Sequence, residues 1–244
     1  MSDGFYDRTA EHVAVLLRDA WTGLGPALTR AVSGMDTSTG PVLDIGAGTG
    51  LGTAVLAAAL PDAAIVAVEP NQALRTALLA RCADDEDLRR RVTVLGDDVL
   101  SAALPDRLSG IVAMNVLGHF PPPQRQALWR LFAGRLDARG RAVLNLQPPF
   151  IPVRVSATPM AEVRVGGLTY VGVAAAEPSG ENAITWNMTY RVERDGEVLT
   201  ELTASDEWAV TSPGVLAAEV AEAGLALAVL DADQHLYEVH PATS

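Results

Sequence analysis

Residues 42–50 read Val-Leu-Asp-Ile-Gly-Ala-Gly-Thr-Gly, and they decide how the rest of the chain is interpreted. A short apolar run leads into an acid, Asp44, and then into glycines at positions 46, 48 and 50, after which the pattern becomes helical. This order predicts a strand, a tight turn and the start of a helix. Glycines let a ligand lie against backbone N–H groups. A carboxylate at position 44 repels phosphate, so the pattern favours a ligand with a cationic amino-acid end over a dinucleotide.

More strands follow, and polar residues stand at the ends of several of them. The predicted strands of this half are residues 42–45, 65–68, 92–95, 111–114 and 140–146. Glu69 ends the second strand, 19 residues past Gly50, a distance at which an acid also suits the ribose of a dinucleotide. Asp97 and Asp98 follow the third strand, and Asn115 follows the fourth. Strands that alternate with helices predict a parallel, doubly wound α/β sheet.

Taken together, these features resemble the class I S-adenosylmethionine (SAM)-dependent methyltransferases over roughly residues 40–147. Residues 44–50 resemble the family's first motif and residues 115–120 its fourth, whose apolar residues line the cleft. The resemblance implies that Glu69 holds both ribose hydroxyls and that Asp97, beside Asp98, accepts a hydrogen bond from the adenine amino group. The implied cofactor is SAM, and the implied cofactor-binding residues are Tyr6, Asp44, Gly46, Ala47, Gly48, Gly50, Glu69, Pro70, Asp97, Asp98, Val99 and Asn115.

Each of these residues also has a purely structural interpretation. The three glycines would serve a tight strand–helix turn with no ligand, and Glu69 would be a solvated strand end. Asp97 and Asp98 would cap a helix or a turn, because aspartate favours both positions. The shared order along the chain favours the cofactor site over these separate explanations.

Composition excludes several other classes of protein. The chain has 244 residues, 49% hydrophobic and 20% charged, with a net charge of −12. All 18 basic residues are arginine, so Schiff-base lysine chemistry and a P-loop are excluded. The acidic balance argues against a nucleic-acid partner, and the run Arg89–Arg91 is interpreted as a solvated surface neutralised by residues 84–87. No apolar run is long enough for a membrane span. The chain has one cysteine, Cys82, so an intrachain disulfide is excluded. From these features we expect a cytoplasmic protein.

The organisation outside the strand–helix repeats suggests four regions. Residues 1–39 are predicted to form an N-terminal helical cap, and residues 40–150 the SAM-binding core. Residues 151–211 are β-rich, with a hairpin turn at 194–197, and predict an antiparallel sheet that roofs the acceptor site or joins two subunits. Residues 212–244 supply a C-terminal helix and the last strands. The predicted fold is a seven-stranded, mostly parallel Rossmann-like sheet with this insertion, and a homodimer stays open.

The chemistry of methyl transfer needs few side chains, because the methyl group of a sulfonium is already activated. The enzyme orients the acceptor, excludes water and in some reactions removes a proton. His119, in the loop after the fourth strand, is the candidate base, although it would also serve as packing against the cofactor or as a helix cap. The candidate substrate-binding residues are Tyr6, His12, His119, Trp186 and His235. The four histidines show no metal-ligand spacing, so no metal is expected.

The predicted function is SAM-dependent methylation of N or O on a small molecule, with natural-product tailoring as a suggestion from composition. Three alternatives remain. In the first, the SAM-binding fold performs non-methyl chemistry, such as a cyclisation. In the second, the chain is an NAD-dependent oxidoreductase, against which Asp44 argues. In the third, the chain is a non-catalytic SAM-binding module.

Overall fold

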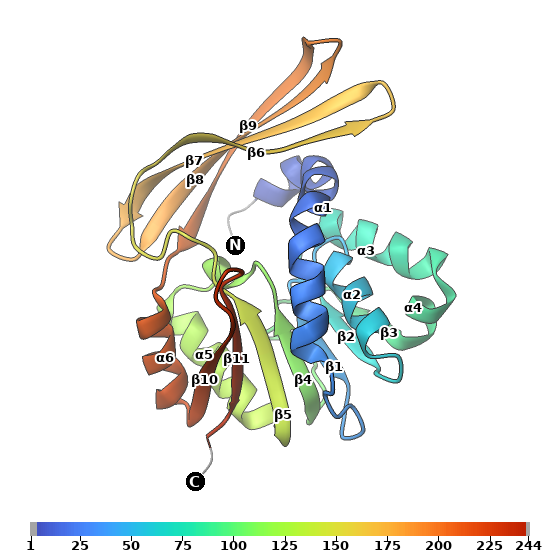
Figure 1. Ribbon diagram of the computed structural model, residues 1–244, viewed down its shortest axis with the longest axis vertical. Helices are drawn as coiled ribbons and strands as arrows, with labels where there is room; N and C mark the ends of the chain where they lie inside the picture. The colour runs from blue at the N-terminus through green and yellow to red at the C-terminus, as the bar shows by residue number, and fades with distance from the viewer. Residues whose placement is uncertain (1–3, 243–244) are drawn as a thin grey trace.

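The computed structural model describes residues 4–242. Its larger sheet has seven strands in the order β10-β11-β5-β4-β1-β2-β3 (Figure 1). The strands are β1 (Val42–Ile45), β2 (Ile65–Val68), β3 (Val92–Leu95), β4 (Leu108–Ala113), β5 (Leu136–Asn145), β10 (Leu225–Asp231) and β11 (Leu236–Pro241). Neighbours among β1 to β5 pair in parallel, and β11 is antiparallel to both β5 and β10. The predicted seven-stranded, mostly parallel sheet is confirmed.

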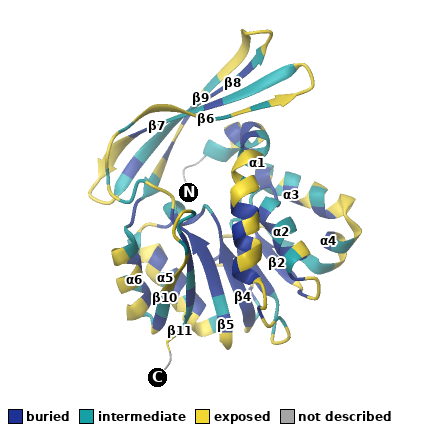
Figure 2. Cartoon of the chain, in the orientation of Figure 1, coloured by how far each residue is buried: buried dark blue, intermediate teal, exposed yellow. Residues whose placement is uncertain are grey.

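Helices cover both faces of this sheet because its strands are apolar on both faces. They are α1 (Phe5–Val32), α2 (Leu51–Ala59), α3 (Gln72–Asp84), α4 (Glu86–Arg91), α5 (Pro122–Arg135) and α6 (Pro213–Glu222), with a 3-10 turn η1 (Leu117–His119). Leu43 of β1 lies in one buried cluster with Trp129 of α5, whereas Val42 lies in a second with Leu28 of α1. Successive residues of β1 therefore face opposite layers. Figure 2 shows the central strands as the most buried part of the molecule.

The second sheet has four antiparallel strands in the order β6-β7-β8-β9. They are β6 (Val155–Val165), β7 (Leu168–Gly180), β8 (Ala183–Arg194) and β9 (Glu197–Ala209). The predicted antiparallel insertion after the fifth strand is confirmed as a fold feature, but its strands are longer than the sequence pattern indicates. Pro159 and Pro178 interrupt that pattern, and the ladder accommodates both beside register shifts instead of ending there.

Helix α1 is the element that joins the two sheets. Figure 1 shows its N-terminal end beneath the second sheet and its later turns against the first. His12 stacks on Tyr190 of β8, with ring centroids 5.0 Å apart and an interplanar angle of 7°. Arg8 donates a hydrogen bond to the carbonyl oxygen of Thr203 in β9 at 2.9 Å. The first three turns of the helix therefore contact the second sheet directly.

The basic run at 89–91 differs in part from the expectation of a solvated surface. Asp87 pairs with Arg90 and Arg91, and these contacts hold the pKa of its carboxyl down at about 2. The side chain of Arg91, however, is only 8% exposed. It donates to three backbone carbonyls, of residues 57, 60 and 63, at the end of α2 and in the turn after it. Carbonyls past a helix end lack partners within the helix, so this arginine is a buried cap.

Among residues 4–242 no helix is both long and apolar enough to cross a membrane.

Candidate active site

The turn between β1 and α2 forms the floor of the site. Gly46, Gly48 and Gly50 all adopt positive φ angles, of 64°, 57° and 83°, a conformation that side-chain-bearing residues rarely adopt. A Cβ atom on Gly46 would lie 2.7 Å from Val116, and one on Gly50 would lie 2.7 Å from Leu78. The glycine pattern is thus required by the backbone conformation and by close packing on both sides of the turn.

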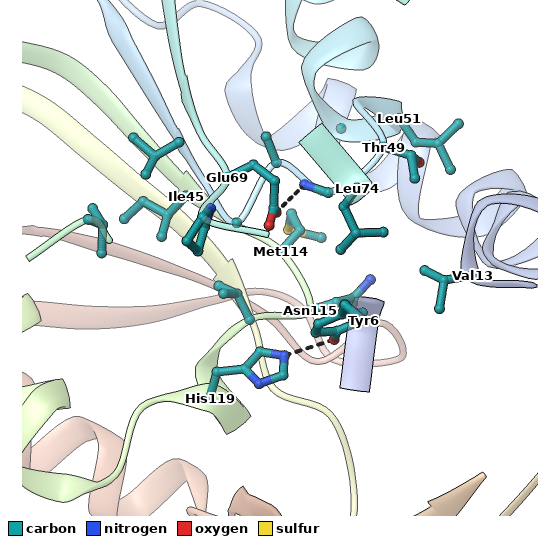
Figure 3. A pocket seen from close by; sticks show the side chains of 18 of the residues that line it. Tyr6, Val13, Ile45, Thr49, Leu51, Glu69, Leu74, Met114, Asn115 and His119 are labelled. Carbon is teal, nitrogen blue, oxygen red and sulfur yellow. Dashed lines mark hydrogen bonds between the residues drawn. The ribbon is translucent and has the colours of Figure 1, made fainter. Parts of the chain in front are cut away.

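A cleft opens above this turn at the carboxyl ends of β1, β2 and β4 and encloses about 1070 Å³, including the part open to solvent. This is where doubly wound folds bind their ligands. The predicted residues that line it are Tyr6, Gly46, Ala47, Gly48, Glu69, Pro70, Asp98, Val99, Asn115 and His119. Helix α1 closes one side with Val13, Leu17 and Trp21, and Figure 3 shows Tyr6 and His119 meeting across the cleft from Glu69.

Glu69 is a buried carboxylate at the cleft wall, 5% exposed. Its Oε2 accepts a hydrogen bond from the N–H of Gly48, and its Oε1 accepts one from the N–H of Asn71, both at 2.8 Å. Burial raises the pKa of this carboxyl, and the two backbone hydrogen bonds oppose the rise. The carboxylate holds the glycine turn against the end of β2. Its acceptor oxygens are of the type that binds a vicinal diol.

Asp44 lies beneath the turn and does not line the cleft. It follows Leu43 on β1, and strand alternation directs its side chain to the α2 face, where its Oδ2 accepts from the hydroxyl of Thr53 at 2.6 Å. Burial raises the pKa of Asp44 to about 7, against the lowering effect of the Thr53 hydrogen bond. In the structure this carboxylate supports the first turn of α2, and its contact with a cationic ligand group stays a prediction.

Two other predicted cofactor residues also lie off the cleft wall. Gly50 is the residue before α2, and its α-carbon faces Leu78 and Arg81 of α3. Asp97 is exposed and absent from the lining, whereas Asp98 and Val99 belong to it. Asp98 also accepts a hydrogen bond from the N–H of Leu100 at 2.9 Å, as expected of an aspartate that opens a turn. Of the two neighbouring acids, Asp98 therefore lines the cleft and Asp97 does not.

The residues present fit SAM. The side-chain-free turn at Gly46 and Gly48 leaves backbone accessible to a methionine moiety, and Glu69 presents a carboxylate beside it that suits a diol. Asn115, held by a 2.7 Å hydrogen bond between its N–H and Asn145, stands at the far side of the turn. Within residues 4–242 no group of three metal-ligating side chains is placed to hold a metal ion.

His119 ends η1 and lies at the other side of the cleft. Its Nε2 is 3.0 Å from the hydroxyl of Tyr6, and its Nδ1 is 3.7 Å from Oδ2 of Asp206 in β9. Trp208 packs edge-on against the imidazole at 4.9 Å and donates from its Nε1 to Asp206 at 3.0 Å. Burial lowers the pKa of His119, and the charge of Asp206 opposes this effect. Three segments distant in sequence therefore meet at one imidazole.

Three predicted substrate residues, His12, Trp186 and His235, do not line the cleft. His12 is buried between α1 and the second sheet, and its Nδ1 has no hydrogen-bond partner among the described residues. Trp186 lines a separate small cavity beside Pro148 and Pro149. His235 packs against Phe150 at 5.0 Å, in a turn between β10 and β11. Each of these three rings packs against another aromatic ring away from the cleft.

The sequence analysis missed several residues of the site. On the cofactor side these are the apolar lining residues Val13, Leu17, Trp21, Leu51, Leu74 and Met114. Beside His119 they are Asp206 and Trp208, which lie two residues apart on the same face of β9. The spacing of Tyr6, Val13, Leu17 and Trp21 on α1 is a helical stripe that the sequence already contains. Nothing local to residues 206–208 connects them to His119.

The fold and the cleft agree with the resemblance of the sequence to the class I SAM-dependent methyltransferases. Residues 42–140 match the family described as "Methyltransferase domain", so this segment of the chain is such a domain. No curated protein matches the chain at a significant level.

Solved structures share this fold over most of their length. DesVI from Streptomyces venezuelae has a TM-score of 0.75 at 19% identity, covering 92% of this chain and 93% of its own. SAM-bound CalS10, an amino pentose methyltransferase from Micromonospora echinaspora, has a TM-score of 0.72 at 15% identity, covering 91% and 92%. KedS8, a sugar N-methyltransferase from Streptoalloteichus sp ATCC 53650, has a TM-score of 0.70 at 17% identity, covering 90% and 87%. At these identities the similarity establishes the fold.

Proposed function

We propose that the chain transfers the methyl group of SAM to the amine nitrogen of a small molecule, with an amino sugar of a natural product as the favoured acceptor class. The observation that carries this proposal is the pair formed by His119 and Tyr6 at the edge of the SAM cleft, 3.0 Å apart. The pair places a nitrogen base and a phenol beside the space that an acceptor must enter.

An amine needs its lone pair to accept a methyl group, and at neutral pH most alkyl amines carry a proton instead. When bound, SAM supplies a methyl group on a positively charged sulfur. Burial lowers the pKa of His119, which favours the neutral imidazole, the form that can receive a proton. In this mechanism the hydroxyl of Tyr6 passes its proton to Nε2 of His119 as it takes one from the ammonium, so the imidazole holds the proton.

The charge of the cleft also favours an amine. Glu69 and Asp98 line it, and no arginine is found among the described lining residues. Both acids lie on the cofactor side, so they act on an acceptor through the negative potential of the whole cleft, which attracts a cationic acceptor and repels an anionic one. The names of two solved structures agree with this choice, since KedS8 is a sugar N-methyltransferase and CalS10 an amino pentose methyltransferase.

A paired acceptor panel tests the proposal. Each amino sugar is assayed with SAM beside the same sugar carrying a hydroxyl in place of the amine, and products are detected by the mass gain of one methyl group. We expect methylation of amines only. Methylation of the hydroxyl partners alone would mean that the enzyme methylates oxygen and not nitrogen. Binding of S-adenosylhomocysteine (SAH) with no transfer to any acceptor would contradict the proposal.

The same assay tests the role of His119. His119→Ala should lower turnover about 100-fold, the lower end of the usual contribution of a general base, and leave SAH affinity nearly unchanged. His240→Ala is the matched control, because His240 lies on β11 away from the cleft. A His119→Ala variant that loses SAH affinity instead would make this histidine a cofactor contact.

A further inference from the structure

Asp206 is an acid of the second sheet that reaches the site of the first. It lies on β9, opposite Trp186 in the register of the sheet, and is 4% exposed. The indole N–H of Trp208, two residues along the same strand face, donates to its Oδ2 at 3.0 Å. A charge this deeply buried is costly unless it has partners. The indole orients the carboxylate, and Nδ1 of His119 lies 3.7 Å from the same oxygen.

The two nitrogens of His119 thus face chemically different groups. A neutral imidazole carries one N–H, and the hydrogen bonds around the ring decide which nitrogen holds it. On the Nδ1 side stands the carboxylate of Asp206, which at 3.7 Å is beyond hydrogen-bond distance and favours an N–H there through its negative charge. On the Nε2 side stands the hydroxyl of Tyr6, and burial, together with the charges of Asp206 and Glu69, raises the pKa of this phenol so that it keeps its proton and donates.

We propose that Asp206 is the positioning residue for His119: it holds the proton on Nδ1, leaves the Nε2 lone pair to accept from the hydroxyl of Tyr6, and stabilises the imidazolium that forms when Tyr6 passes its proton to Nε2 while taking one from the acceptor ammonium. The inference rests on the proposed function for its catalytic consequence. The proton balance is closed: the ammonium loses one proton, Tyr6 gains one and gives one up, and the proton on Nε2 returns to solvent after the product departs.

The surroundings of His119 contain few other groups that would produce this effect. Tyr6 comes from α1, and Asp206 and Trp208 come from β9. Tyr190 of β8 is also electrostatically coupled to Tyr6 and Asp206, but burial raises its pKa to about 12, so it stays neutral. Asp206 is therefore the anionic group that opposes the desolvation of His119.

The test uses nitrogen-15 NMR of the histidine rings in the full chain without acceptor. In the wild type, His119 should show a protonated Nδ1 and an unprotonated Nε2. In Asp206→Asn, the pKa of His119 should fall by about one pH unit or more, because a carboxylate within about 4–6 Å raises a neighbouring pKa by that amount. A mixed or reversed tautomer is expected as well. Glu207→Gln, an exposed acid on the opposite face of β9, is the matched control and should change neither property.

Turnover supplies the second readout. Asp206→Asn should lower kcat about tenfold with a shifted pH profile, while the KM for SAM stays within about twofold. A wild-type His119 protonated on Nε2 would overturn the inference without any variant, as would a folded Asp206→Asn protein with the wild-type tautomer and pKa. Because the NMR needs no methyl transfer, a protein with the expected tautomer and no activity on amines would refute the proposed function alone.

Discussion

Replacing Glu69 with glutamine tests the cofactor side of the cleft with a minimal change. In the folded chain the two carboxylate oxygens accept from the N–H groups of Gly48 and Asn71, each at 2.8 Å. A carboxamide has one acceptor oxygen, so one of these N–H groups would face an NH₂ group. A buried donor that loses its acceptor costs about 1–3 kcal/mol, and we expect Glu69→Gln to lower the free energy of unfolding by about that amount.

The effect on cofactor binding follows from the same carboxylate. Hydrogen bonds to a charged group contribute about 1.5–3 kcal/mol, which corresponds to roughly 10- to 150-fold in affinity. We therefore expect the Kd for S-adenosylhomocysteine (SAH) to rise at least tenfold in Glu69→Gln. Calorimetric titration measures this directly and requires no acceptor, and urea unfolding of the same preparation measures the stability.

The control is Glu181→Gln, because Glu181 is exposed in the turn between β7 and β8. It removes the same charge from the chain and should change neither quantity. If Glu69→Gln bound SAH within about threefold of wild type while remaining folded, the carboxylate would support only the glycine turn and the ribose assignment would be refuted.

Two further predictions concern groups beside the turn and beside η1. Folding raises the pKa of Asp44 from 3.8 to about 7, so the wild type loses stability as pH rises from about 4 to about 7; Asp44→Asn removes this loss. Urea unfolding should show the variant gaining about 2 kcal/mol relative to wild type between about pH 5.5 and 8, and a constant difference would contradict the assigned burial. Gly118→Ala would place a methyl group 2.7 Å from Cδ2 of Trp208. This substitution should lower the free energy of unfolding by about 1–3 kcal/mol, as measured by scanning calorimetry. It should also lower turnover while the affinity for SAH stays unchanged. An unchanged melting temperature would contradict the prediction, because it would mean that β9 moves away without a loss of stability.

The cofactor half of the site could be predicted because its signals are local. The glycines of the turn have conformations that few other residues adopt, and Glu69 ends a strand whose neighbours are fixed by parallel pairing. The outward or inward direction of Asp44 was also contained in the sequence, because alternation along β1 opposes it to Leu43. The sequence analysis did not predict this direction because it treated residues 44–50 as a set of ligand contacts and not as the end of a strand with two faces.

The acceptor half could not be predicted in the same way. His12 and Tyr6 lie on neighbouring faces of one helix, and only the docking of the second sheet decides that His12 stacks on Tyr190 while Tyr6 reaches His119. Asp206 and Trp208 have the ordinary alternation of a strand. Their meeting with η1 depends on the placement of a whole sheet, which no local pattern encodes.

The contact of α1 with both sheets has a consequence for enzyme engineering. An exchange of acceptor specificity between related enzymes would ordinarily transplant the inserted strands, residues 155–209, as a module. Here the first turns of α1 supply Tyr6 and, through Arg8, a hydrogen bond to the backbone of β9. A chimera that receives the strands alone would pair a foreign acid and indole with the host's helix. The transferable unit has two parts, the first turns of α1 and the second sheet, separated in the chain by the entire cofactor-binding core.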